Sequence, residues 1–197
     1  MSRAPTSRDR RAVSPTGMEV ASQTVRPWAK LSEGISYAGF RTILTRRFRL
    51  PDGREADFDV VQNPDTVAVV ALTEAGEVIL VREYRPGPER LLYELPGGAV
   101  DDGETPEEAA RRELLEETGY EGDLRSAGSY WAGAYSTHRR HAFVATNCYR
   151  VAELWPEDAE AVEVALMPFA DFRGHVRSGE LTDVATAYLG LDALSRL

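Results

Sequence analysis

One stretch of the sequence, residues 98–119, gathers acidic side chains on a short predicted helix between two glycines. Thr105 is a favourable N-cap, and Glu108 completes a Thr-x-x-Glu capping box. Gly119 is a typical helix end, because glycine readily adopts the left-handed conformation that terminates many helices. The sequence therefore predicts a helix over residues 106–118.

Three glutamates of this predicted helix, Glu113, Glu116 and Glu117, stand at positions i, i+3 and i+4. This spacing projects their carboxylates from one face, where like charges repel each other. A hard divalent cation such as Mg²⁺ or Mn²⁺ prefers oxygen ligands and would turn this repulsion into binding. The alternative, a solvated acidic helix with i,i+4 arginine–glutamate pairs, explains the charges but not the flanking glycines.

The residues around the predicted helix resemble the signature of the Nudix family. That signature is a glycine, five residues, a glutamate, seven residues, and then Arg-Glu-apolar-x-Glu-Glu-x-Gly-apolar. It is filled in register by Gly98, Glu104, Arg112, Glu113, Leu114, Glu116, Glu117 and Gly119, with Tyr120 as a mild departure. The resemblance implies an α/β (α+β) fold, a sandwich of the α/β/α type with a mixed sheet, in which the signature forms a loop, a helix and a loop.

The same resemblance implies a metal-dependent pyrophosphohydrolase that uses Mg²⁺, with Mn²⁺ as a possible substitute. The expected metal ligands lie on the helix and in the loop before it: Glu113, Glu116, Glu117 and the carbonyl of Gly97. Arg112 and Glu104 are expected to orient these carboxylates. Bound cations would neutralise substrate phosphates and lower the pKa of the attacking water.

A segment upstream of the signature narrows the resemblance to one branch of the family. Val81–Pro86 followed by Leu92–Gly98 is similar to the ADP-ribose pyrophosphatases. The resemblance implies that Arg85 contacts substrate phosphate, which suits an arginine fork, and that Glu94 helps to hold the nucleotide end. The alternative is that both residues are structural charges at strand ends.

The expected reaction is hydrolysis of the pyrophosphate bond of ADP-ribose or a related nucleoside diphosphate sugar, giving a nucleoside monophosphate and a sugar phosphate. Residues 133–141 lack the proline and the glutamate that the branch often has there, which leaves open a dinucleotide or a nucleoside triphosphate as substrate. A nucleotide-sensing domain without turnover is a further alternative. His138 and His141 are candidates for acid–base chemistry, with a hydrogen-bonded structural role equally open.

A second acidic segment, residues 153–160, precedes a predicted strand near the C-terminus. In the ADP-ribose branch the corresponding loop supplies a catalytic carboxylate, and the resemblance makes Glu160 the first candidate and Asp158 the second. The alternative is a solvated loop, since acidic residues are common in turns.

Three regions follow from the pattern along the chain. Residues 1–25 read as a disordered basic tail, residues 26–63 as a small antiparallel β subdomain, and residues 64–197 as the Nudix domain. The subdomain is expected to hold two strands, Ile35–Leu50 and Glu55–Val61. By resemblance it contributes a homodimer contact and an aromatic residue that stacks on the base.

Trp28 is the first candidate for the stacking aromatic, ahead of Tyr37 and Phe40, although an aromatic residue beside a hairpin more often serves simple packing. In the main domain the further expected strands are Thr66–Thr73, Glu77–Tyr84, 91–94, 124–133, 141–147 and 161–167, with helices near 168–178 and 183–196.

Charge and composition exclude some classes of binding partner. The formal net charge is −9, and residues 101–121 alone hold nine acidic side chains and two arginines. This balance argues against a nucleic-acid polymer or an anionic membrane as partner, while cations could still bridge a polyanionic small molecule to the carboxylates. A single cysteine, Cys148, is compatible with the cytoplasm, and no apolar run has the length of a membrane span.

Overall fold

The computed structural model describes residues 25–153 and 162–196, which hold three helices and nine strands. The chain divides into two compact units. Of the described residues, one unit holds residues 25–33 with Arg46–Phe58, and the other holds Gly34–Thr45 with residues 59–153 and 162–196. The predicted tail lies outside the described residues except for its last position.

The N-terminal strands form a three-stranded sheet in the order β1 (Ala29–Ala38), β2 (Thr42–Arg49) and β3 (Glu55–Gln62). The antiparallel N-terminal sheet is thereby confirmed. The prediction of one continuous strand from Ile35 to Leu50 was wrong, because the chain turns at Gly39, whose N–H donates to the Arg41 carbonyl at 3.1 Å. Apolar residues on both sides of this turn concealed it in the sequence.

The second unit contains a six-stranded sheet with strand order β6-β5-β4-β8-β7, and β9 pairs with β5. Its strands are β4 (Thr66–Thr73), β5 (Glu77–Arg85), β6 (Arg90–Glu94), β7 (Tyr120–Trp131), β8 (Arg139–Arg150) and β9 (Glu163–Pro168). The central pair, β4 and β8, is parallel, whereas the other pairs are antiparallel. The sheet is therefore mixed, as predicted.

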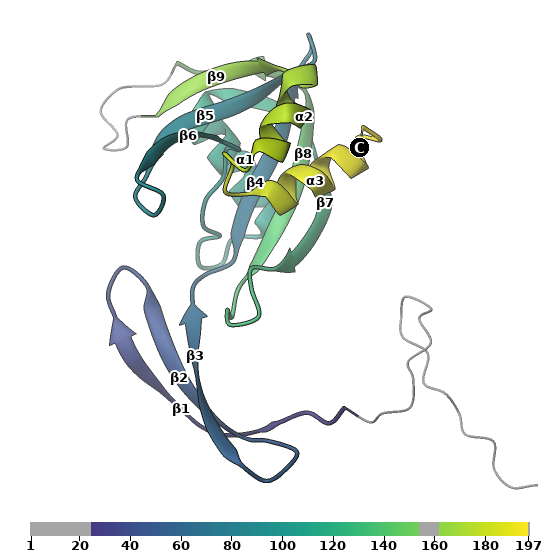
Figure 1. The fold of residues 1–197 in the computed structure, drawn as a ribbon. Coiled ribbons are helices and arrows are strands. Elements are labelled where there is room, and N and C mark those ends of the chain that lie inside the picture. The colour runs from purple at the N-terminus through teal and green to yellow at the C-terminus, as the bar shows by residue number, and fades with distance from the viewer. Residues whose placement is uncertain (1–24, 154–161, 197) are drawn as a thin grey trace, which may run out of the picture. The chain divides into compact units, whose positions relative to one another are not determined.

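Helices cover both faces of this sheet. Helix α1 (Pro106–Thr118) packs on one face, and α2 (Phe169–Ser178) with α3 (Val184–Ala193) packs on the other (Figure 1). Successive strand residues point to opposite faces, so Val69 packs in the α1 layer and Val70 beneath α2 and α3. The α/β/α sandwich is confirmed. None of these described helices is long and apolar enough to cross a membrane.

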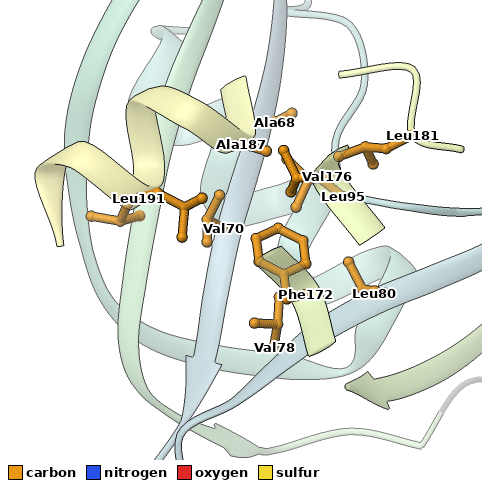
Figure 2. Packing of buried hydrophobic residues seen from close by; sticks show 11 residues of the cluster. Ala68, Val70, Val78, Leu80, Leu95, Phe172, Val176, Leu181, Ala187 and Leu191 are labelled. Carbon is orange, nitrogen blue, oxygen red and sulfur yellow. The ribbon is translucent and has the colours of Figure 1, made fainter. Parts of the chain in front are cut away.

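The layer beneath α2 and α3 is built around Phe172 (Figure 2). Its ring is fully buried and lies among aliphatic side chains that include Val78 and Leu80 of β5. Val176 from the next turn of α2 and Leu191 of α3 complete the same cluster. Apolar burial of this extent anchors both helices, and with them the turn that joins α2 to α3.

Helix α1 begins and ends as its sequence predicts. The Thr105 Oγ1 accepts a hydrogen bond from the Glu108 N–H at 3.3 Å, and the Glu108 carboxylate accepts one from the Thr105 N–H at 2.8 Å. At the other end Gly119 has φ 74°, and its N–H donates to the Leu115 carbonyl at 2.8 Å. Local signals therefore set the boundaries of the helix that carries the signature glutamates.

Two helical glycines offer a matched test of the packing. A Cβ at Gly190 of α3 would lie 2.5 Å from Cγ2 of Val70, whereas a Cβ at Gly174 of α2 would meet nothing within 4 Å. We expect Gly174→Ala to raise the free energy of unfolding by about 0.5–1 kcal/mol, because alanine favours helix. Gly190→Ala should lower it by about 1–3 kcal/mol through overpacking. Urea denaturation measures both, and equal changes in the two variants would contradict the close approach of α3 to β4.

Candidate active site

A cleft of about 750 Å³ opens at one edge of the main sheet. It lies where β5 ends and where β4 and β8 begin, next to the loop before α1 and the turn before α3. Its polar lining includes Glu83, Arg85, Gly97, Gly98, Arg140 and Asp183. The cleft thus brings the glycine loop of the signature beside charged residues that lie far from it in sequence.

Glu117 is a partly buried carboxylate at the C-terminal end of α1. Its Oε2 accepts a hydrogen bond from the Gly97 N–H at 2.8 Å. Burial raises the pKa of Glu117 to about 8, and the negative charges of Glu113 and Glu83 act in the same direction, against the opposing effect of the Gly97 N–H. At neutral pH this carboxyl group therefore carries a proton unless a cation takes its place.

Glu113 lies one helical turn earlier, and its side chain is only 13% exposed. Burial raises the pKa of this carboxyl as well, although the neighbouring Arg112 opposes the shift. A Cβ added at Gly98 would lie 2.3 Å from Oε1 of Glu113. Glycine at this position therefore leaves the space that the carboxylate occupies.

Arg112 links the acidic residues of the signature. Its Nε and Nη2 donate to the two carboxylate oxygens of Glu104, each at 3.0 Å. Its Nη1 donates to Glu113 at 2.8 Å and to Glu116 at 3.2 Å, while Nη2 also donates to the Ala99 carbonyl at 3.0 Å. The Arg112 hydrogen bonds hold the pKa of Glu104 below its ordinary value. One guanidinium thus fixes the directions of three carboxylates.

The three predicted ligand glutamates of α1, Glu113, Glu116 and Glu117, differ in solvent exposure. The side chain of Glu116 is 59% exposed, whereas Glu113 and Glu117 are turned inward. Across residues 25–153 and 162–196, no three histidine, cysteine or acidic side chains converge closely enough to enclose a cation as they stand. The chemistry of Glu113 and Glu117 nevertheless fits Mg²⁺ or Mn²⁺, because both are desolvated oxygen donors that mutual repulsion and burial disfavour as free anions.

Arg85 is one of three arginines that line the cleft, together with Arg41 and Arg140. Its Nη2 pairs with Oε1 of Glu83 at 2.7 Å, and its Nε lies 3.8 Å from Oε1 of Glu94. This Nε is buried and makes no hydrogen bond within the described residues. Glu94 is 1% exposed, so its carboxylate supports Arg85 from within the protein rather than from the cleft surface.

Four charged residues of the cleft are absent from the sequence-based candidates: Arg41, Glu83, Arg140 and Asp183. Strand alternation offered a signal for Glu83, since it stands two residues before Arg85 and shares its face of β5. Arg140 pairs in register with Thr66 at the start of β4 and forms an ion pair with Asp183. That pairing joins distant segments, and no spacing in the sequence marks it.

Trp28 and the two candidate histidines make contacts of their own. Trp28 belongs to the N-terminal unit, where its ring packs 5.2 Å from Phe58 and 6.0 Å from Phe48 between centroids. His138 Nδ1 contacts the Ser136 Oγ at 2.7 Å, and His141 Nε2 contacts Oδ2 of Asp65 at 2.9 Å. Both histidines are thus engaged in local hydrogen bonds. Asp158 and Glu160 lie outside the described residues.

Comparison with known proteins bears on the class of enzyme. The model of the NUDIX domain matches residues 62–185. An ADP-ribose pyrophosphatase of Bacillus subtilis (strain 168) is 35% identical over 142 residues, which is 71% of this chain and 77% of that protein. An ADP-ribose pyrophosphatase of Mycobacterium tuberculosis is 31% identical over 163 residues, 77% of this chain and 75% of that protein.

Two further similarities extend the comparison. A CMP-5'-(N-acetyl-N-hydroxy-3-aminopropyl)phosphonate hydrolase of Streptomyces rubellomurinus is 30% identical over 156 residues, 79% of this chain and 75% of that protein. A crystal structure described as an ADP compounds hydrolase superposes with a TM-score of 0.74 at 21% identity, covering 89% of this chain and all of that one. At that identity the structural likeness concerns the fold.

The mixed sandwich and the signature helix define a Nudix-type hydrolase. The chain belongs to the Nudix family, as its signature predicts. It is accordingly an enzyme of the pyrophosphohydrolase class, which confirms that expectation.

Proposed function

We propose that this enzyme hydrolyses the pyrophosphate bond of ADP-ribose or a closely related nucleoside diphosphate sugar, using Mg²⁺ or Mn²⁺. The products are a nucleoside monophosphate and a sugar phosphate. The observation that carries the proposal is the pair of partly buried carboxylates, Glu113 and Glu117, in a family of pyrophosphohydrolases. They lie beside Gly97 and Gly98, which line the cleft of Arg85. Two relatives that match over most of their length are ADP-ribose pyrophosphatases.

Glu113 and Glu117 are the proposed principal metal ligands, with Glu116 and the Gly97 carbonyl as further ligands. When bound, the cation supplies charge neutralisation of the phosphates and lowers the pKa of the attacking water. For Glu117 to bind a cation, it must release the proton that its burial retains.

The chain's own residues supply position and charge. Arg112, fixed by its fork to Glu104, holds the direction of Glu113, and it is proposed as a positioning residue. Arg85 is proposed to bind a substrate phosphate, because it lines the cleft and its side chain is 33% exposed. Glu94 is the proposed support of this substrate site.

Two further proposed contributions rest on the family resemblance alone. Glu160, or Asp158 as second candidate, is proposed as the general base that takes a proton from the attacking water. Trp28 is proposed as the aromatic residue that stacks on the nucleotide base.

A second candidate substrate is a different nucleotide, such as a CMP-linked compound. The Streptomyces phosphonate hydrolase is nearly as similar to this chain as the mycobacterial relative is. Residues 133–141 also depart from the segment that is typical of the ADP-ribose branch. The cleft and the proposed metal ligands Glu113 and Glu117 would serve either substrate, because in both cases the proposed reaction hydrolyses a phosphorus anhydride bond.

Product analysis tests the proposed reaction. We expect Mg²⁺-dependent conversion of ADP-ribose to AMP and ribose 5-phosphate, resolved by anion-exchange chromatography. Glu117→Gln keeps the size of the side chain but removes its negative charge, and kcat should fall at least about a hundredfold. Other nucleoside diphosphate sugars, dinucleotides, nucleoside triphosphates and CMP-linked compounds serve as the comparison panel.

The controls separate the possible outcomes. Glu121→Gln removes a charge from β7, outside the proposed machinery, and should leave turnover unchanged. Faster turnover of another panel member would replace ADP-ribose as the substrate and leave the metal site standing. Binding of a nucleotide with no turnover of any panel member would contradict the enzymatic proposal and favour a sensor.

We further propose that the enzyme acts as a homodimer. Every residue of β1 is exposed, and Leu31, Ile35 and Tyr37 present apolar surface along this edge strand. An exposed apolar edge of this kind is normally covered by another chain. Light scattering at micromolar concentration should give twice the 21.8 kDa chain mass, and Ile35→Lys should shift the protein toward monomer. A monomeric wild type would contradict the proposal.

A cytoplasmic location is proposed on the chemistry of the single cysteine. Cys148 is a buried free thiol, and burial raises its pKa to about 11. A thiol that is protonated and covered reacts slowly, so Cys148 acts as a core residue and does not require an oxidising compartment. Localisation of the tagged protein after cell fractionation tests this proposal.

A further inference from the structure

The turn between α2 and α3 is tied to the main sheet by charged side chains. Three contacts hold it: Arg90 Nη1 to Glu180 at 2.9 Å, Glu94 to Thr182, and Arg140 to Asp183. Two residues of this turn, Thr182 and Asp183, line the cleft of Arg85. A segment that follows the signature helix by more than 60 positions therefore forms part of the cleft wall.

Thr182 makes three hydrogen bonds to one buried carboxylate. Its N–H lies 3.1 Å from Oε1 and 2.9 Å from Oε2 of Glu94, and its Oγ1 donates to Oε2 at 3.0 Å. Because Glu94 is 1% exposed, water cannot replace these donors without rearrangement. The orientation of the Glu94 carboxylate is consequently set by Thr182.

On its other side Glu94 faces Arg85. The Arg85 Nε lies 3.8 Å from Oε1 of Glu94 and is buried, while Nη2 pairs with Glu83. A partly buried guanidinium needs a nearby fixed anion, since an uncompensated charge there is costly. Glu94 and Glu83 therefore hold the Arg85 guanidinium from two directions. Rotation of the Glu94 carboxylate would remove one of these two ion pairs.

We propose that Thr182 is a positioning residue of the substrate site, acting through Glu94 on Arg85. Its hydroxyl and N–H orient the Glu94 carboxylate, and this carboxylate holds Arg85 in the orientation that receives a substrate phosphate. The inference rests on the proposed function in assigning a phosphate ligand to Arg85. It makes Glu94 a support of Arg85 that does not touch the nucleotide.

The test compares Thr182→Val, which removes the hydroxyl but keeps the N–H and the shape, with Thr182→Ser, which keeps the hydroxyl. We expect Thr182→Val to raise KM for ADP-ribose about five- to tenfold, with kcat changed less than about twofold, because a hydrogen bond to a charged group is lost from binding alone. The Kd of ADP-ribose measured by calorimetry in EDTA should rise by the same factor. Thr182→Ser should match the wild type.

Two controls separate positioning from general destabilisation. Thr73→Val removes a hydroxyl that accepts the Glu77 N–H at 3.1 Å in the β4–β5 turn, away from the cleft, and should leave KM and Kd unchanged. In an Arg85→Ala background, Thr182→Val should cause no further loss of affinity, since its effect passes through Arg85. An unchanged KM and Kd in Thr182→Val, or a full effect without Arg85, would overturn the proposal.

The substrate question is kept separate by the choice of ligand. If the wild type binds a different panel nucleotide instead of ADP-ribose, the same variants are measured with that nucleotide. The substrate proposal then fails while the role of Thr182 is still decided. If the wild type binds no nucleotide at all, both proposals are overturned.

Discussion

The site depends on the burial of the Glu117 carboxylate against the N–H of Gly97. Burial raises the pKa of this group to about 8, so the folded protein holds a proton that the unfolded chain releases near pH 4.5. The sign of the linkage follows: the stability of the metal-free protein falls as pH rises between these values, because folding takes up a proton that becomes scarcer. The proposed divalent cation would remove that conflict, because it would replace the proton as the partner of the carboxylate.

Packing on both faces of the main sheet holds the elements around the Glu117 carboxylate. Helix α1 is capped at both ends and packs through Ala109, Ala110 and Leu114 onto the main sheet. On the opposite face, the cluster around Phe172 secures α2 and α3, and hence the turn that carries Thr182. The two layers meet at the edge where β5 ends and β4 begins. The glycine loop that Glu117 contacts and the turn that carries Thr182 both line the cleft of Arg85.

Features formed by residues close together in the sequence could be predicted, whereas features formed by residues far apart in the sequence could not. The boundaries of α1 were predicted correctly, since Thr105 and Glu108 act within the first turn of the helix and Gly119 acts on its last turn. The spacing of the glutamates could not show that Glu116 faces solvent while Glu117 is buried, because that difference depends on how the sheet packs beneath the helix. The pairing of Glu94 with Thr182 spans 88 positions and leaves no local pattern. The turn at Gly39 was missed for a different reason, since β-forming residues flank it on both sides.

The central claim is that a divalent cation displaces a proton from Glu117. Calorimetric titration of the protein with Mn²⁺, in buffers of differing ionisation enthalpy, measures the protons released per ion. With a pKa of about 8, Glu117 should contribute about one proton per ion at pH 6.5 and almost none at pH 9.5, and Glu117→Gln should abolish this contribution. Binding at pH 6.5 without proton release, or equal release from Glu117→Gln, would contradict the account.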